Sequence, residues 1–310
     1  ELNNKLLWGN LLMNNREVLK NFIEAKRKNP YTKNKTIDQL RKETENAGSL
    51  IPLPENIKYR NVVAGNVNAE WITCGEVNEN RIFMFMHGGG YYRGSIAATR
   101  ATVARISAEA KVKCLSINYR LAPEHPFPAA IDDTYSAYEW LINEGISPEH
   151  IIVSGQSAGG GLCLALLLKI KDNNYYQPKG AVALSPWTDL SQTGKTMVTN
   201  EKIDPVISKQ YLDRFAKLYF PDSYNMSYLA SPIIGELSGL PDMLIQVGSA
   251  ETMLDDSKRF FEKAKKVNVN VKLEIWEDMF HGWHSNAHIL KDAEDAIISI
   301  GKFCRNLLND

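Results

Sequence analysis

The sequence predicts an α/β domain built on a mostly parallel sheet with helices on both faces. Short apolar segments with strand character alternate with loops or helical patterns along most of the 310 residues. These segments are too continuously apolar for a sheet covered on one side only, which favours burial of both faces. A single hydrophobic core stops growing near about 250–300 residues, so the length suits one large domain with a smaller attached unit.

Eight strand-like segments carry this prediction. Three follow one another from residue 57, and each of the other five precedes a loop or a helical pattern. They are residues 57–64, 69–74, 81–86, 112–119, 150–155, 180–185, 242–248 and 271–276. Ligands of such sheets bind beyond the carboxyl ends of the strands, so the functional residues are expected just after them.

Helical patterns outside this alternation predict a cap. They cover residues 2–28, 36–47 and about 206–220. Residues 1–50 and 191–228 are therefore expected to form the cap, over a core made of residues 51–190 and 229–310. The first 35 residues carry eight basic and three acidic side chains. That surplus could favour a membrane surface, although an amphipathic lid explains the same pattern.

The composition of the chain limits the classes of partner and the cellular location that we expect. The chain has 36 basic and 36 acidic residues, so its zero formal charge favours a neutral small molecule over nucleic acid. Its four cysteines form no C-x-x-C pair, which favours free thiols in a reducing compartment. The longest apolar run in the central region, Leu162–Leu168, is far shorter than the roughly 20 residues of a membrane span. With no apolar signal core at the start, the expected location is cytoplasmic.

A nucleophile is expected at Ser157. It stands in Gly-Gln-Ser-Ala-Gly, residues 155–159, which follows a strand and opens a helix. In that setting G-x-S-x-G forms a strained turn that exposes its serine. A plain glycine turn or a phosphate-binding loop are the alternatives. A P-loop needs Lys and then Ser or Thr, whereas Leu162 follows Gly161. A dinucleotide site needs an acid at a strand end, but Asp172 lies in a polar segment.

Three glycines after His87 predict an oxyanion-binding loop. They follow the strand of residues 81–86 and leave backbone N–H groups open to a ligand. Preorganised N–H donors stabilise the negative charge that develops on a carbonyl oxygen during acyl transfer. Gly89 and Gly90, with Ala158 after the nucleophile, are the expected donors. A merely flexible loop is the alternative interpretation.

The base is expected to be His281. Hydrolases with this turn order their residues Ser, acid, His, which leaves His281, His284 and His288. Only His281 lies in the loop after the strand of residues 271–276. His284 and His288 are four residues apart at the predicted start of the last helix. No carboxylate or cysteine there completes a set of metal ligands, so we interpret both as partly exposed helix residues.

The orienting acid is expected to be Glu251. Asp255 and Asp256 lie in the same loop, but Thr252-x-x-Asp255 matches a helix-start pattern, and acids in a first turn face the helix dipole favourably. Glu251 has no such explanation. It also lies nearer the strand end, from which a carboxylate can reach the imidazole Nδ1–H. Asp255 remains the alternative.

The chain resembles the hormone-sensitive-lipase family of α/β-hydrolase esterases. The resemblance rests on the HGGG segment at residue 87, YRLAPEHPFPAA at 119, GQSAGG at 155 and HGW at 281, and it covers most of residues 57–305. It implies an eight-stranded sheet, a helical cap and hydrolysis of short-chain carboxylic esters without a cofactor or metal. It also implies an acid 30 residues before the histidine, which is the spacing of Glu251 and His281, and it suggests a homodimer joined through a sheet edge.

The chain departs from the family pattern at two positions. Gln156 stands where the family often has Asp or Thr, and the acid is Glu where the family frequently has Asp. By the same resemblance Arg120, Glu124 and His125 are structural. Trp187 and Asp189 belong to a loop near the acyl pocket or to a helix-capping turn.

Together these residues predict a serine ester hydrolase. Ser157 attacks the carbonyl, His281 moves the proton, Glu251 orients His281, and an acyl-enzyme forms. An amidase or deacetylase would use the same residues. A non-catalytic small-ligand receptor is the rival from another class, but such a receptor typically lacks the histidine.

Overall fold

The computed structural model describes residues 15–28, 35–221 and 226–309. Its eight strands are β1 (Ile57–Ala64), β2 (Val67–Cys74), β3 (Asn78–Met86), β4 (Val112–Ile117), β5 (Ile151–Gln156), β6 (Gly180–Leu184), β7 (Asp242–Gly248) and β8 (Val271–Trp276). All eight predicted strand segments are confirmed. The predicted bounds of β1, β7 and β8 equal the observed bounds.

The strands form one sheet in the order β1-β2-β4-β3-β5-β6-β7-β8. Only β2 runs against its neighbours, β1 and β4, and every other pairing from β4 to β8 is parallel. Parallel neighbours end at the same edge of a sheet. The loops that follow β3, β5, β7 and β8 therefore reach a common edge, and these loops carry the predicted site residues.

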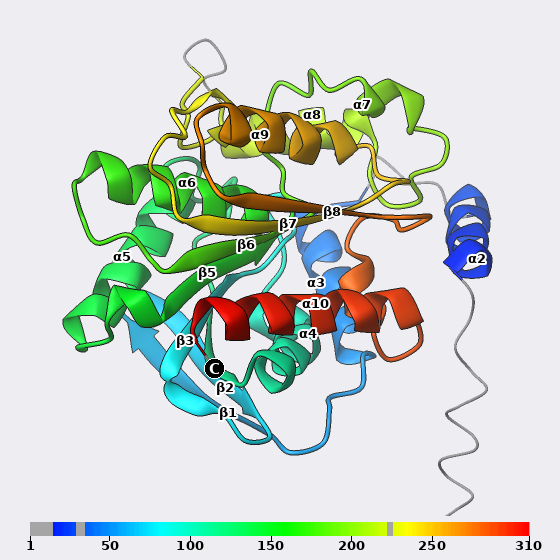
Figure 1. The fold of residues 1–310 in the computed structure, drawn as a ribbon. Coiled ribbons are helices and arrows are strands. Elements are labelled where there is room, and N and C mark those ends of the chain that lie inside the picture. The colour runs from blue at the N-terminus through cyan, green and yellow to red at the C-terminus, as the bar shows by residue number, and fades with distance from the viewer. Residues whose placement is uncertain (1–14, 29–34, 222–225, 310) are drawn as a thin grey trace, which may run out of the picture.

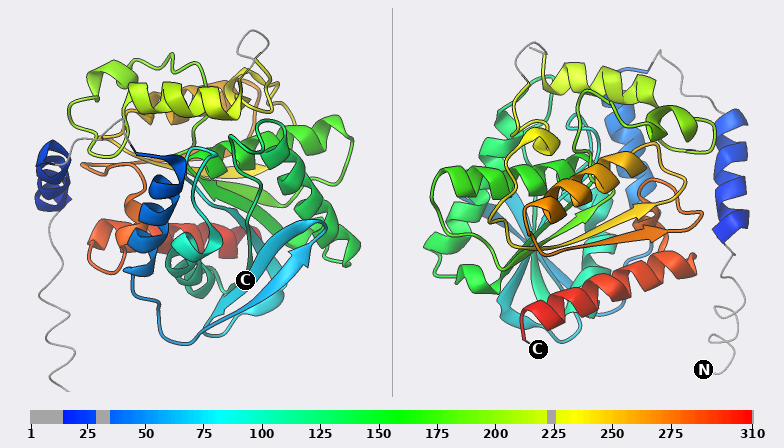
Figure 2. Two further views of the ribbon diagram at one scale, coloured as in Figure 1. Left: turned by 180° about the vertical axis from the view of Figure 1, so that it is seen from behind. Right: turned by 45° about the horizontal axis from the view of Figure 1, so that its top comes forward.

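Helices cover both faces of the sheet (Figures 1 and 2). The α-helices are α2 (Asn15–Lys28), α3 (Ile37–Ser49), α4 (Ile96–Ala110), α5 (Ala129–Asn143), α6 (Ala158–Asp172), α7 (Thr196–Thr199), α8 (Lys209–Tyr219), α9 (Leu254–Lys266) and α10 (Lys291–Leu307). Three short 3₁₀ helices are η1 (Pro148–His150), η2 (Pro232–Ile234) and η3 (Trp283–Asn286). No helix in the described ranges is long and apolar enough to cross a bilayer.

Alternate residues of the central strands feed two hydrophobic cores. Met84 and Val153 belong to the core that includes residues of α5, α6, α8 and α9. Phe83 and Ile152, one residue earlier in each strand, belong to the core that includes residues of α4 and α10. Successive side chains of a strand point to opposite faces, so these apolar strands are buried on both sides, as the sequence predicts.

The predicted cap helices are only partly as expected. The helix expected from residue 2 is described only from Asn15, and residues 2–14 lie outside the described ranges. α3 has Thr36 as its N-cap and a capping box with Gln39. α8 begins at Lys209, three residues later than predicted, because the N–H groups of Val206 and Ile207 are bound by the Asp204 side chain. The domain boundaries stay a prediction.

Candidate active site

Ser157 occupies the turn between β5 and α6 in a strained conformation. Its φ of 58° and ψ of −119° lie outside the regions that a residue with a Cβ ordinarily occupies. Three backbone hydrogen bonds hold this turn: the Ser157 N–H donates to Leu184, and the Ser157 carbonyl accepts from Gly161 and Trp187, at 2.9–3.0 Å. The side chain, 8% exposed, is presented at the sheet edge.

Glycines flank Ser157 because the backbone of the turn is crowded. A Cβ on Gly155 would lie 2.1 Å from the Gly159 carbonyl oxygen. A Cβ on Gly159 would lie 2.1 Å from the Met86 carbonyl oxygen. Both positions therefore exclude side chains, and strand β5, helix α6 and the end of β3 approach as closely as the predicted turn requires.

The structure brings Glu251 and His281 together. Glu251 follows β7 and is fully buried, and its Oε2 lies 2.8 Å from Nδ1 of His281, in the loop after β8. The Glu251 Oε1 accepts hydrogen bonds from the Ser185 hydroxyl at 2.7 Å and from the Gly248 N–H at 2.6 Å. A carboxylate facing Nδ1 favours the imidazole tautomer whose Nε2 is free to accept a proton.

The pKa of His281 is raised above its ordinary value. Burial lowers the pKa, but the hydrogen bond from Nδ1 to Glu251, the Glu251 charge and the Asp204 charge outweigh burial, while the Arg93 charge also lowers the pKa. Carboxylates close to an imidazole stabilise its protonated form. A base with this pKa can hold the proton that a reacting hydroxyl gives up.

Two glycine contacts join the loops that carry these residues. Gly282 is next to His281, and a Cβ on it would lie 2.6 Å from the side-chain Nε2 of Gln156, the residue before Ser157. A Cβ on Gly88 would lie 3.2 Å from the Ser157 Cβ. The loops after β3, β5 and β8 therefore meet around the serine.

The glycine loop after β3 is held in a conformation that suits glycine. Gly89 has φ 121° and Gly90 has φ 61°, and a Cβ on Gly89 would lie 2.2 Å from the Arg93 carbonyl oxygen. The Ala158 N–H begins α6, and the first N–H groups of a helix have no intrahelical acceptor. The three expected donors thus come from the glycine loop, whose Gly88 lies near Ser157, and from the helix that begins just after Ser157.

The segment after β4 supports this loop. The Tyr119 hydroxyl donates to the His87 carbonyl at 2.8 Å, and the two rings stack with centroids 4.3 Å apart. Burial lowers the pKa of His87 to about 4, so this ring is neutral. Arg120 pairs with Asp133, and Glu124 pairs with Arg41. These partners agree with the structural roles expected for Arg120 and Glu124.

Segments of the predicted cap pack against the loops of the candidate site. In α8, Phe215 stacks on Tyr92 and Tyr219 stacks on Tyr91, with centroids 4.3 and 3.7 Å apart. In α2, Phe22 stacks on Phe280, one residue before His281, at 4.3 Å.

The segment before α8 binds the loop of the acid. Asn200 donates to the Glu251 carbonyl at 2.9 Å, and Asp204 accepts from the Thr252 N–H at 2.8 Å.

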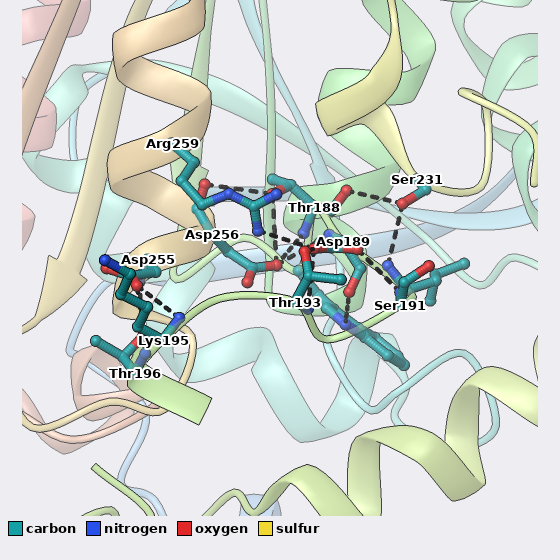
Figure 3. A network of polar contacts seen from close by, with 12 residues as sticks. Thr188, Asp189, Ser191, Thr193, Lys195, Thr196, Ser231, Asp255, Asp256 and Arg259 are labelled. Atoms are coloured by element: carbon teal, nitrogen blue, oxygen red, sulfur yellow. Dashed lines mark hydrogen bonds and ion pairs between the residues drawn. The ribbon is translucent and has the colours of Figure 1, made fainter. Parts of the chain in front are cut away.

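Thr252 and Asp255 do not form the helix-start pattern predicted for them. α9 begins at Leu254 without a side-chain cap, and Thr252 binds Asp204 instead. Asp255 accepts hydrogen bonds from the N–H groups of Lys195 and Thr196 (Figure 3). Both acids of the first turn of α9 do have structural partners, but those partners lie in a distant segment of the chain.

Asp256 is a buried member of the network in Figure 3. Its Oδ2 accepts from the N–H groups of Thr188 and Asp189 at 2.8 and 2.9 Å. Burial raises the pKa of Asp256 to about 7. Asp189 in turn accepts from Thr193 and Arg259, so its side chain organises a turn, while the Trp187 N–H contacts Ser157.

The interpretation of His284 as a partly exposed helix residue is wrong. His284 is fully buried in η3, and its Nε2 lies 3.0 Å from the Gln246 side-chain oxygen. Burial lowers its pKa to about 3. His288 is partly buried in the turn before α10. The described residues contain no group of His, Cys, Asp and Glu side chains that could hold a metal ion.

Known proteins share this architecture along most of the chain. A family model for the α/β-hydrolase fold matches residues 83–285. An esterase of Acinetobacter venetianus is 32% identical over 92% of this chain and 94% of its own. An acetyl-hydrolase of Streptomyces hygroscopicus is 33% identical over 93% of this chain and 95% of its own.

A solved structure agrees with these relatives. A crystal structure of an esterase from the bacterial hormone-sensitive lipase family superposes with a TM-score of 0.90, at 38% identity, over 94% of this chain and 98% of that one. The chain therefore belongs to the α/β-hydrolase family and, within it, to the hormone-sensitive-lipase family of esterases. It is an enzyme of the ester-hydrolase class.

Proposed function

We propose that the enzyme hydrolyses short-chain carboxylic esters through Ser157, His281 and Glu251. The observation that carries this proposal is the 2.8 Å contact of a buried Glu251 carboxylate with His281 Nδ1, on a loop that touches the turn of Ser157. A serine hydroxyl is a weak nucleophile until a base takes its proton, and an oriented imidazole is such a base.

The reaction proceeds in two halves. The Ser157 Oγ attacks the ester carbonyl carbon while its proton moves to His281 Nε2. The negative charge on the carbonyl oxygen is stabilised by the N–H groups of Gly89, Gly90 and Ala158. The bond to the alcohol oxygen then breaks, and His281 returns the proton to the departing alcohol. Water repeats these steps on the acyl-enzyme and releases the acid.

The preference for short acyl chains is supported by two findings. One of the relatives is named an acetyl-hydrolase, and acetyl is a two-carbon acyl group. Aromatic side chains of α8 also pack directly on the glycine loop, with Phe215 in contact range of Gly90. We infer from this packing that a long acyl chain fits poorly on that side of the loop.

A series of p-nitrophenyl esters from acetate to palmitate tests the proposal. We expect kcat/KM to be highest for acetate or butyrate and to fall for longer chains. Ser157→Ala, checked for folding by circular dichroism, should be inactive. A folded alanine variant that hydrolyses acetate normally would refute the mechanism, and a preference for palmitate would refute the short-chain assignment. Matched p-nitroanilides measure any amidase activity, which we expect to be much lower.

A further inference from the structure

Ser185, which follows β6, contacts the acid of the proposed triad. The side chain is fully buried, and its hydroxyl donates to Glu251 Oε1 at 2.7 Å. Ser185 stands two residues before Trp187, and its residue type alone predicts no role for it. Among the residues that the structure describes, Oε1 has two donors, this hydroxyl and the backbone N–H of Gly248.

The backbone of Ser185 is strained and firmly held. Its φ of 44° lies in the left-handed region, which residues with a Cβ rarely adopt. The Ser185 N–H donates to the Gln246 carbonyl at 2.7 Å. Two residues later the Trp187 N–H donates to the Ser157 carbonyl, and then the Thr188 N–H donates to Asp256 (Figure 3). A strained conformation persists where its surroundings over-determine it, as they do here.

This segment therefore connects the nucleophile with the acid. Trp187 touches the turn of Ser157 through its backbone, while Ser185 touches the carboxylate of Glu251 through its side chain. Because Ser185 and Gly248 both bind Oε1, the other oxygen of Glu251 is the one that faces His281. The strained backbone of Ser185 orients its hydroxyl toward Oε1, while Oε2 contacts His281.

We propose that Ser185 is a positioning residue, which fixes the Glu251 carboxylate so that Oε2 holds the imidazole of His281. The proposal rests on the triad proposed above. Without the hydroxyl, the buried Glu251 carboxylate keeps, from the described part of the chain, only the Gly248 N–H on Oε1 and can rotate away from His281. Misplacement by about 1 Å can cost a reaction about 100-fold. Because Ser185 acts on orientation, kcat should fall while KM changes little.

Two substitutions separate the hydroxyl from the backbone. Ser185→Ala removes the hydroxyl and keeps the strain, whereas Ser185→Gly removes the hydroxyl and relieves the strain. We expect kcat for p-nitrophenyl acetate to fall about 10- to 100-fold in both, with KM within about twofold. Ser116→Ala is the matched control, since Ser116 of β4 is also fully buried, and its hydroxyl has no hydrogen-bond partner among the described residues. It should keep wild-type kcat.

Urea midpoints and a double-mutant cycle exclude a purely structural role. The Gly variant should unfold at a midpoint no lower than that of the Ala variant, yet be equally impaired. In a Glu251→Gln background, Ser185→Ala should lower kcat by less than about threefold, because residues that act as a unit are not additive.

Several results would overturn the role of Ser185. These are wild-type kcat in a folded Ala or Gly variant, recovery of kcat in Gly alone, or an undiminished loss in the Glu251→Gln background. If Ser157→Ala is inactive while the Ser185 variants are normal, only this inference fails. If Ser157→Ala is active, the proposed function itself fails.

Discussion

Shortening Glu251 by one methylene group tests the triad geometry quantitatively. In Glu251→Asp the carboxylate withdraws by up to about 1.5 Å, one C–C bond, so the 2.8 Å contact with His281 Nδ1 widens to as much as about 4.3 Å. That distance is well outside the range of a hydrogen bond. The same withdrawal separates the carboxylate from Ser185 and Gly248, which leaves a buried charge without its donors.

We expect kcat to fall about 100-fold in Glu251→Asp, which corresponds to about 2.7 kcal/mol in the activation barrier. Glu251→Gln should fall further, by about 10⁴, because an amide can hold the wrong imidazole tautomer. The assay is steady-state hydrolysis of p-nitrophenyl acetate, with folding checked by circular dichroism.

Asp255→Asn is the matched control, because Asp255 is the rival acid from the same loop. Its carboxylate binds the backbone of Lys195 and Thr196, so the substitution should leave kcat within about threefold of wild type. Wild-type activity in Glu251→Asp would refute the requirement for this geometry. A large loss in Asp255→Asn with a normal Glu251→Gln would transfer the role to Asp255.

Three further predictions concern pH and the glycine loop. Because the pKa of His281 is raised above about 6.5, kcat/KM should fall as pH drops, with a midpoint above that value, and a flat profile from pH 5 to 8 would contradict the base. Gly89→Ala forces a Cβ to 2.2 Å from the Arg93 carbonyl oxygen, so we expect a lower urea midpoint and at least a 10-fold loss in kcat. The control is Gly75→Ala, where φ is 70° but no atom lies near the added Cβ, and this variant should keep wild-type kcat. Equal activity in the two variants would refute the argument. Burial raises the pKa of Asp256 to about 7, so the folded protein loses stability as pH rises from about 4 to 7 and the buried carboxyl loses its proton. The stability of Asp256→Asn relative to wild type should therefore be greater at pH 8 than at pH 5. A difference in urea midpoints that does not change with pH would contradict this.

The strands were predictable because their signal is local. Each of the eight apolar segments carries its own signal in its residues, and β1, β7 and β8 have the predicted bounds. Glycine spacing around Ser157 likewise predicts the turn, since close backbone approach at Gly155 and Gly159 excludes any other residue.

Contacts between distant segments could not be predicted in this way. Thr252 has the sequence of a helix start, yet its hydroxyl and N–H bind Asp204, 48 residues earlier. His284 follows His281 by three residues, and only its burial in the structure and its contact with the Gln246 side chain of β7 show that it is a core residue. In both cases a tertiary partner overrides the local pattern.

Ser185 shows the same limit for the site itself. A serine at a strand end carries no signal of its own, and its importance comes from a positive φ and from a carboxylate 66 residues later. The positions of the proposed Ser, Glu and His triad follow from chain order and strand ends. The residue that we propose holds the acid could be found only from the structure.

Trapping the covalent intermediate tests the central claim most directly. The enzyme is mixed with p-nitrophenyl acetate, quenched in acid during turnover, digested and mapped by mass spectrometry. We predict an acetyl group on Ser157, accumulating further in His281→Ala if that variant deacylates more slowly than it acylates. Acetyl found on another residue, or none on Ser157 in enzyme that is turning over, would contradict the account.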